Sequence, residues 1–253
     1  MRFRLVHHDV VDSTSERAFA ALAAGDARDG DVHVARGQSA GRGRRGTAWV
    51  SPVDEGLYLS VVLLPGPPPY LPAALTIAAG LAAVEALNSL GLAPFTEDAP
   101  RLKWPNDVLV RGAKICGLLA ESRALDPAQP HYVLGIGLNV RQRQFPNELL
   151  EEQPVTSLAR LGRDLSLETA REALLARLGP RLAQVRSDHR RLAEDYLVAS
   201  DLAERPVVVR CGKECHAGMV RGLSLTEGLE LAGADGRGHV LPLELVRGIE
   251  LRD

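Results

Sequence analysis

Apolar and polar positions in the first part of the chain predict a strand, a helix and a second strand. Residues 3–11 have the apolar content of a strand. Ser13 and Glu16 stand at capping-box spacing, and the helix that they begin ends at Gly25. Residues 32–35 then predict a short strand that leads into a polar, glycine-rich stretch.

The middle of the chain combines one long apolar helix with closely spaced strands. Residues 73–90 are rich in alanine and apolar nearly all round, which predicts a buried helix. Residues 101–110 predict a strand, a tight turn at Pro105 and a second strand. Further strands are predicted over 56–64, 114–121 and 132–140, with a loop at 126–130. Because the connections are short, we expect a largely antiparallel sheet.

The last hundred residues change from a helical pattern to short strands. Helices are predicted over 156–161, 166–179 and 180–198, and they are assigned no chemistry. Five short strands follow after residue 205, with one of their turns at 235–236. Five strands in under fifty residues indicate a small β-barrel. We therefore expect a larger domain over 1–203 and a smaller one over 204–253.

Composition narrows the class of protein without naming its chemistry. The chain has 253 residues, 45% of them hydrophobic and 25% charged, as in ordinary globular proteins. The net charge of −2 disfavours general binding to nucleic acid or to membrane surfaces. The N-terminus lacks the apolar core of a signal peptide, and no apolar run approaches the roughly 18 residues that span a bilayer. The three cysteines are too few for a disulfide framework. We expect a cytoplasmic protein.

The most distinctive stretch holds four glycines and four arginines within residues 36–46. Gly41 to Gly46 formally fits a dinucleotide-binding fingerprint, but β-rich sequence follows where a helix should start. The same residues fail as a phosphate-binding P-loop, because Thr47 stands where lysine is needed. An anion-binding loop between two strands remains, and its alternative is a disordered basic loop. Gln38 and Trp49 within the stretch favour the anion-binding loop.

Other polar positions indicate what such a loop would act upon. Asn106 and Asp107 follow Pro105 at an exposed bend, and Lys103 and Lys114 lie on either side of it. Three glycines within strands, at 117, 135 and 137, suggest a ligand lying across one face of the sheet. Trp49 offers a stacking surface and Asn139 an amide that can read a base edge. This inventory favours attack on a nucleotide phosphate, catalysed by positioning and charge neutralisation.

Four segments together resemble the biotin protein ligases in that family's order and spacing: Gly41–Gly46 with Trp49–Pro52, Lys103–Asp107, Lys114–Gly117 and Gly137–Asn139. The resemblance covers essentially the whole chain. It implies the α/β (α+β) fold shared by class II aminoacyl-tRNA synthetases and lipoate ligases, with a largely antiparallel mixed sheet. It also implies a catalytic biotin- and ATP-binding domain followed by a C-terminal SH3-like β-barrel.

The reaction that the resemblance implies has two steps. The biotin carboxylate attacks the α-phosphate of ATP with Mg²⁺ present, which gives biotinyl-5′-adenylate and pyrophosphate. A lysine on the biotin carboxyl carrier domain of a carboxylase, of the acetyl-CoA carboxylase type, then attacks the acyl group and releases AMP. Monomeric and homodimeric members share these motifs, so the oligomeric state stays open.

The resemblance also assigns roles residue by residue. Lys114 and Arg44 match catalytic cations that neutralise the reacting oxygens. Biotin-binding positions are Ser13, Thr14, Ser15, Gln38, Gly41, Arg42, Gly43, Arg44, Lys114, Gly117 and Gly135. ATP-binding positions are Arg44, Trp49, Lys103, Asn106 and Asn139. Asn106 and Asp107 match a site for metal or phosphate, with the division of roles between them left open.

This chain also departs from the family's pattern. Ser15 stands where asparagine is common, and Thr47 and Ala48 replace residues that are commonly basic. The twelve residues before Ser13 are too few for a helix-turn-helix, so we expect neither DNA binding nor repressor activity. Two alternatives remain: a lipoate or octanoate ligase on the same fold, and a non-catalytic module that binds nucleotides or RNA. Net acidity and 4% aromatic residues weigh against RNA.

Overall fold

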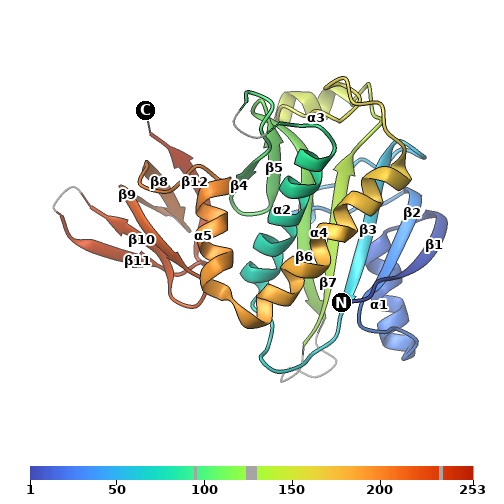
Figure 1. Cartoon of the computed structure of the whole chain (residues 1–253), viewed down its shortest axis with the longest axis horizontal. Helices are drawn as coiled ribbons and strands as arrows, with labels where there is room; N and C mark the ends of the chain where they lie inside the picture. The colour runs from blue at the N-terminus through green and yellow to red at the C-terminus, as the bar shows by residue number, and fades with distance from the viewer. Residues whose placement is uncertain (94–95, 124–129, 234–235, 253) are drawn as a thin grey trace.

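Two sheets, one of seven and one of five strands, organise the chain (Figure 1). The computed structural model describes residues 1–93, 96–123, 130–233 and 236–252. The expected loop at 126–130 and turn at 235–236 fall mostly outside the described residues. The seven-stranded sheet has the order β1-β2-β3-β7-β6-β5-β4, and only β1 and β2 run parallel. The expectation of a largely antiparallel mixed sheet is confirmed.

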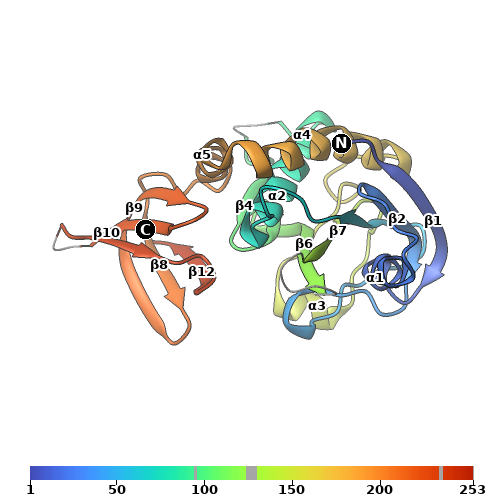
Figure 2. The ribbon, with the colours of Figure 1, turned by 90° about the horizontal axis from the view of Figure 1, so that it is seen from below.

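The large sheet is built from strands close to the predicted ones. They are β1 (Arg4–Val11), β2 (Asp31–Gln38), β3 (Gly56–Leu63), β4 (Arg101–Lys103), β5 (Asp107–Val110), β6 (Ala113–Arg123) and β7 (His131–Asn139). Every residue of β3 is buried, because helices cover both faces of the sheet at its centre. Figure 2 shows α2 and α4 on one side and α1 and α3 on the other.

The helix α2 (Pro72–Ser89) forms the centre of the core beneath this sheet. Twelve of its residues are buried, as its all-round apolar pattern predicts. Its length and composition would suffice to cross a membrane, so the expectation that no apolar run approaches that length was wrong. About two thirds of the helix (67%) is covered by the rest of the protein, as in the core helix of a globular fold.

The helix α1 (Thr14–Ala24) starts as predicted but without a capping box. The Ser13 hydroxyl accepts a hydrogen bond from the Ser15 amide at 3.2 Å, and Gly25 ends the helix in the left-handed conformation. Glu16 does not return to the Ser13 amide, because Asp12 Oδ1 already accepts from that amide at 2.7 Å. The Glu16 carboxylate is thereby available to pair with Arg42 and Arg123.

The helices after the sheet differ from prediction in three places. Residues 156–161 form a loop that ends in a turn, because the amides of Thr156, Leu158 and Ala159 donate to backbone carbonyls at the ends of β6 and β7 and not along a helix. A short helix, α3 (Asn147–Glu152), occupies a segment where none was predicted. The remaining helices are α4 (Leu167–Ser187) and α5 (His189–Ala199).

The break between α4 and α5 lies at Asp188, eight residues beyond the predicted one. Pro180 removes one helical hydrogen bond, but buried residues on both sides of it, including Leu178 and Leu182, pack the helix onto the core. Asp188 leaves helical geometry and its Oδ1 caps α5 by accepting from the Arg191 amide at 2.9 Å. Tertiary packing thus outweighs the helix-breaking effect of proline.

The second sheet is antiparallel, with the order β11-β10-β9-β8-β12. Its strands are β8 (Pro206–Cys211), β9 (Glu214–Ser224), β10 (Gly228–Ala232), β11 (Gly238–Leu241) and β12 (Val246–Leu251). The five predicted strands are confirmed, in agreement with an SH3-like module. Trp104 joins the sheets, since its indole Nε1 donates to the Val246 carbonyl at 3.0 Å and its ring packs edge-on against Tyr196.

A buried histidine gives the fold a defined response to acid. His33 on β2 is 3% exposed, and its Nδ1 lies 3.0 Å from His8 Nε2 on β1. Burial, and then the neighbouring His8, lower the pKa of His33 to about 4. An unfolded histidine titrates near 6.5, so the unfolded state takes up the proton first as pH falls. Stability present above pH 6.5 is therefore lost between about 6.5 and 4.

We expect the free energy of unfolding to fall by roughly 2 kcal/mol from this histidine between pH 7 and pH 5. Urea denaturation at both pH values measures the change. The His33→Gln variant, which cannot titrate, should lose less stability over the same interval. Parallel losses in the wild type and the variant would contradict this assignment.

Candidate active site

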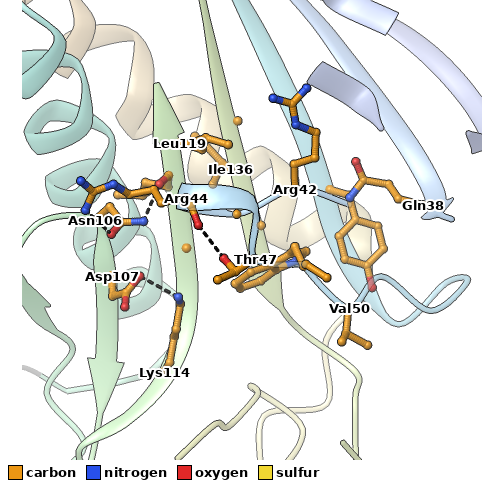
Figure 3. A pocket seen from close by; sticks show the side chains of 18 of the residues that line it. Gln38, Arg42, Arg44, Thr47, Val50, Asn106, Asp107, Lys114, Leu119 and Ile136 are labelled. Carbon is orange, nitrogen blue, oxygen red and sulfur yellow. Dashed lines mark hydrogen bonds and ion pairs between the residues drawn. The ribbon is translucent and has the colours of Figure 1, made fainter. Parts of the chain in front are cut away.

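A cavity of about 300 Å³ lies on the face of the large sheet opposite α2. Strand alternation explains its floor: Ile136 and Leu138 of β7 point into the core around α2. Gly135, Gly137 and Asn139 consequently face the other way and line the cavity. Figure 3 shows the loop residues Arg44 and Thr47 above this floor, with Asp107 and Lys114 to one side.

Hydroxyl and amide groups gather at one end of the cavity. Ser13, Thr14 and Ser15 at the start of α1 are all at most 5% exposed. Gln38 Oε1 accepts from the Thr14 amide at 2.8 Å. Ser60 of β3, fully buried, lies between the hydroxyls of Thr14 and Ser15 at 2.8 and 3.0 Å. This end can form several directed hydrogen bonds with a compact polar ring.

The glycine floor is covered by the indole of Trp49. A Cβ atom at Gly137 would lie 2.4 Å from the Trp49 ring, and one at Gly117 would lie 2.6 Å from it. Only glycine therefore lets the ring rest on the sheet at these two positions. Lys114 Nζ lies 5.5 Å from the centre of the same ring. Gly135 instead faces Ser15, and a Cβ atom there would lie 3.2 Å from the Ser15 hydroxyl oxygen.

Positive charge gathers at the other end of the cavity. Lys114 of β6 pairs with Asp107 of β5 through a 2.8 Å contact, and both side chains are more than four-fifths buried (Figure 3). Arg44 Nη1 lies 3.5 Å from Asn106 Oδ1, while Asn106 Nδ2 donates to the Leu118 carbonyl at 2.8 Å. Arg247, from the second sheet, lines the same cavity.

The electrostatics of this end favour an anionic ligand. Burial lowers the pKa of Arg44, and the nearby guanidiniums of Arg45 and Arg247 lower it further. Like charges held close together repel, and an anion placed among them relieves that repulsion. The thiol of Cys116 lies close by, but burial raises its pKa to about 12, so it stays protonated and is a poor nucleophile.

Arg42 lines the cavity as expected, but its guanidinium is engaged by acidic residues. Its guanidinium pairs with Glu16 of α1 and Glu121 of β6, and Figure 3 shows it pointing away from Lys114. The short 3₁₀ helix η1 (Arg44–Gly46) follows, with Arg45 in the left-handed region at φ 56°. Gly41 and Gly43 accept close approach by Trp49 and Thr47 respectively. These two glycines shape the loop and offer no side chain to a ligand.

Lys103 departs from expectation. It lies exposed on β4, where Leu102 and Trp104 on either side are buried, so alternation directs Lys103 away from the core. It is absent from the residues that line the described cavity. Asn139 does line the cavity, but its Nδ2 donates to the Thr156 carbonyl at 3.0 Å and its Oδ1 accepts from Gln142 at 3.2 Å. One donor and one acceptor position on this amide remain.

The other predicted positions come together around the one cavity. These are Ser13, Thr14, Ser15, Gln38, Gly43, Arg44, Trp49, Asn106, Asp107, Lys114, Gly117, Gly135 and Asn139. Sequence reasoning missed Ser60, Arg247 and the wall formed by Phe145 and Leu149 near α3. Ser60 could have been found, because it interrupts an otherwise apolar strand. No motif in the sequence around Arg247 indicated that this residue belongs to the site.

Asp107 and Asn106 would suit a cation that arrives with phosphates. Among the described residues, no group of three or more His, Cys, Asp or Glu side chains could hold a metal ion. Asp107 supplies a carboxylate and Asn106 an amide oxygen at the cation end of the cavity. Mg²⁺ is commonly held by one or two carboxylates together with substrate phosphates and water. The pair fits that limited role.

Comparisons with known proteins agree with one another. The sequence pattern of the Biotin/lipoate A/B protein ligase family matches residues 8–139. The Biotin--[acetyl-CoA-carboxylase] ligase of Mycobacterium tuberculosis is 40% identical over 192 residues, which cover 74% of this chain and 67% of that protein. The Bifunctional ligase/repressor BirA of Bacillus subtilis is 37% identical over 57% of this chain, and the match spans less than half (43%) of its length.

A solved structure matches over nearly the whole chain. The biotin protein ligase from Aquifex aeolicus, in complex with biotin and ATP, superposes with a TM-score of 0.75 at 28% identity. The match covers 98% of both chains, so it includes the large sheet and the smaller one.

The contact between Gly137 and Trp49 yields a direct prediction. In Gly137→Ala the new methyl group would overlap the indole, and relieving such an overlap typically costs about 1–3 kcal/mol. We expect Trp49 to leave the floor, with red-shifted emission and greater quenching by iodide. Gly238→Ala is the matched control, since a Cβ atom there meets nothing within 4 Å. Unchanged tryptophan emission in a folded Gly137→Ala variant would contradict the prediction.

Proposed function

The chain belongs to the Biotin/lipoate A/B protein ligase family, and we propose that within it this protein is an ATP-dependent biotin protein ligase. It forms biotinyl-5′-AMP and transfers biotin to a lysine of a carboxylase's carrier domain. One observation carries the proposal: a single cavity joins a buried hydroxyl and amide end to a cluster of cations across a glycine floor. That arrangement suits a ligand with a polar ring at one end and a carboxylate at the other.

In the first step the cations bring two anions together. The biotin carboxylate oxygen attacks the α-phosphorus of ATP, a new C–O–P link forms, and the bond to the β-phosphate oxygen breaks to release pyrophosphate. Lys114 and Arg44 neutralise the carboxylate and the α-phosphate oxygens, whose repulsion otherwise opposes the reaction. Arg247 extends the positive surface toward the leaving phosphates. Fixed cations of this kind stabilise charge that develops in the transition state.

In the second step the carrier lysine amine attacks the acyl carbon of the mixed anhydride. The C–N bond forms, the bond from carbon to the phosphate oxygen breaks, and AMP leaves with that oxygen. The anhydride is readily hydrolysed, so the loop over the cavity excludes water until the carrier arrives. Arg42 would leave Glu16 and Glu121 to join the closed loop, and Gly41 and Gly43 give that segment its freedom.

The remaining roles extend the same proposal. Trp49 and Asn139 contact the adenine, since both lie toward the cation end of the floor. Ser13, Thr14, Ser15 and Gln38 hold the polar ring of biotin. Asn106 and Asp107 supply oxygens to the Mg²⁺ that accompanies ATP, where the ion would offset phosphate charge. Lys103 has no ligand in this arrangement.

The proposal also covers the division of the chain into domains and the compartment in which the protein works. The catalytic domain spans 1–203 and the smaller domain 204–253, a division that the two separate sheets support. The protein works in the cytoplasm, where its relatives' carboxylase substrates would be met. The lipoate ligase alternative requires an apolar end for a dithiolane ring, and the buried hydroxyl cluster disfavours it.

Pyrophosphate release tests the proposed activity. The purified protein should release pyrophosphate from ATP when biotin is present, and should not do so with lipoate or octanoate. Release that depends on lipoate would select the lipoate ligase. Binding of ATP without any turnover would select a non-catalytic nucleotide-binding module.

Substitution of Lys114 and substitution of Lys103 should have very different effects on the rate of pyrophosphate release. Lys114→Ala should slow biotin-dependent pyrophosphate release by about 100- to 1,000-fold, because it removes a buried cation from the reacting oxygens. Lys103→Ala should remain near the wild-type rate, because its side chain is exposed outside the cavity. Stopped assays on both folded variants measure the two rates. Equal losses in the two variants would contradict the assignment.

Arg44 should govern retention of the intermediate. We expect Arg44→Gly to form the adenylate and to release it into solution, because its guanidinium joins the loop to the Asn106 turn across the bound phosphate. Filtration after reaction with labelled biotin measures free adenylate. Arg143→Gly, at an exposed loop position, serves as the control. Complete retention of the adenylate by Arg44→Gly would contradict this role of Arg44.

A further inference from the structure

A continuous chain of hydrogen bonds runs through the hydroxyl end of the cavity. It starts at Ser15, passes through Ser60 and Thr14, and reaches the Gln38 side chain. Gln38 Nε2 continues it by donating to Ser51 Oγ at 2.8 Å, and Ser51 donates to the Trp49 carbonyl at 3.0 Å. The chain thus links the floor of the cavity to the loop that covers it.

Two contacts with Thr14 fix which way the side-chain amide of Gln38 points. The Thr14 amide can only donate, so the atom 2.8 Å from it must be the Gln38 oxygen. That oxygen also lies 3.2 Å from the Thr14 hydroxyl and has no proton of its own. This contact is therefore a hydrogen bond only if Thr14 donates its single hydroxyl proton to Gln38.

That assignment sets the direction of the rest of the chain. The single hydroxyl proton of Thr14 already points to Gln38. The 2.8 Å contact between Thr14 and Ser60 is therefore a hydrogen bond in which Ser60 donates. Ser60 has then used its own proton, and its 3.0 Å contact with Ser15 requires Ser15 to donate. One proton order alone satisfies all three contacts. The reverse order leaves two oxygens facing each other at 3.2 Å in a buried site, which is costly.

We propose that Ser60 is a positioning residue that transmits this proton order from Thr14 to Ser15, so that Ser15, like the Thr14 hydroxyl held by Gln38, presents only lone pairs to the ligand. The proposal rests on the proposed function, because it explains how the cavity would select a cyclic urea. A urea ring carries N–H donors, which need acceptors opposite them. Ser60 does not have to contact the ligand, because it acts through the Ser15 hydroxyl, whose proton it accepts.

The surroundings of Ser15 leave its lone pairs accessible. Gly135 faces the Ser15 hydroxyl, and a Cβ atom there would approach it to 3.2 Å. The missing side chain keeps space beside the oxygen at the cavity floor. Ser60 itself is fully buried and has apolar neighbours along β3, so its hydroxyl has few other partners. A serine there is costly unless its hydrogen bonds are needed.

The test compares biotin with an analogue that lacks one donor. In a cyclic carbamate analogue, a ring oxygen replaces one urea N–H and places a lone pair against the enzyme's lone pairs. Titration calorimetry should give the wild type roughly tenfold or greater preference for biotin. In Ser60→Ala the Ser15 hydroxyl loses its acceptor and is free to turn its proton toward the ligand, while Thr14 still donates to Gln38. The preference should then fall by about three- to tenfold, while the affinity for ATP is unchanged.

Controls make each outcome decisive. Ser122→Ala, at an exposed position of β6, should keep the wild-type preference. Ser60→Cys, of similar size but with a weak donor, should show an intermediate loss, and it replaces Ser60→Ala if that variant does not fold. If Ser60→Ala weakens both ligands by the same factor, or if the wild type shows no preference, Ser60 does not set the proton order. Failure of the wild type to bind biotin at all would instead overturn the proposed function.

Discussion

The ion pair between Lys114 and Asp107 is the contact on which the chemistry of the cavity depends. Both side chains are largely buried, and each is held by a strand whose register is set by β5 pairing with β6. A cation buried alone would be costly, so the Asp107 carboxylate compensates the charge of Lys114 and holds its side chain in place before any substrate arrives. Arg44 has a weaker partner, the neutral Asn106 amide. The cavity therefore keeps unbalanced positive charge that anions can neutralise.

The glycine floor is the second constraint, and it concerns shape. Gly117 and Gly137 let the Trp49 indole rest against the sheet, and Gly135 leaves space at Ser15. A flat surface with cations at one end and hydroxyls at the other can hold an extended ligand of two chemically different halves. The loop from Gly41 to Trp49 closes this space, and Arg42 is tied to acidic residues outside it. These pairs cost little to exchange for contacts with phosphate, since the residues are partly exposed.

Much of this arrangement could be predicted from local patterns, and the failures have physical causes. Alternation and glycine placement predicted the sheet and its floor, because β-strands impose a two-residue period. The helix predicted at 156–161 was wrong because carbonyl groups at the ends of β6 and β7 accept hydrogen bonds from its backbone amides. The break expected at Pro180 lies at Asp188 because packing overrides one lost hydrogen bond. Arg247 comes from another sheet, and local sequence patterns contain no information on that contact.

The central claim is that one cavity activates biotin and passes it to a protein lysine. Mass spectrometry of a biotin carboxyl carrier domain, incubated with this protein, measures that claim most directly. We expect the mass of one biotinyl group on a single lysine, only when both ATP and biotin are supplied. An unmodified carrier domain under those conditions, or modification that proceeds without ATP, would contradict it.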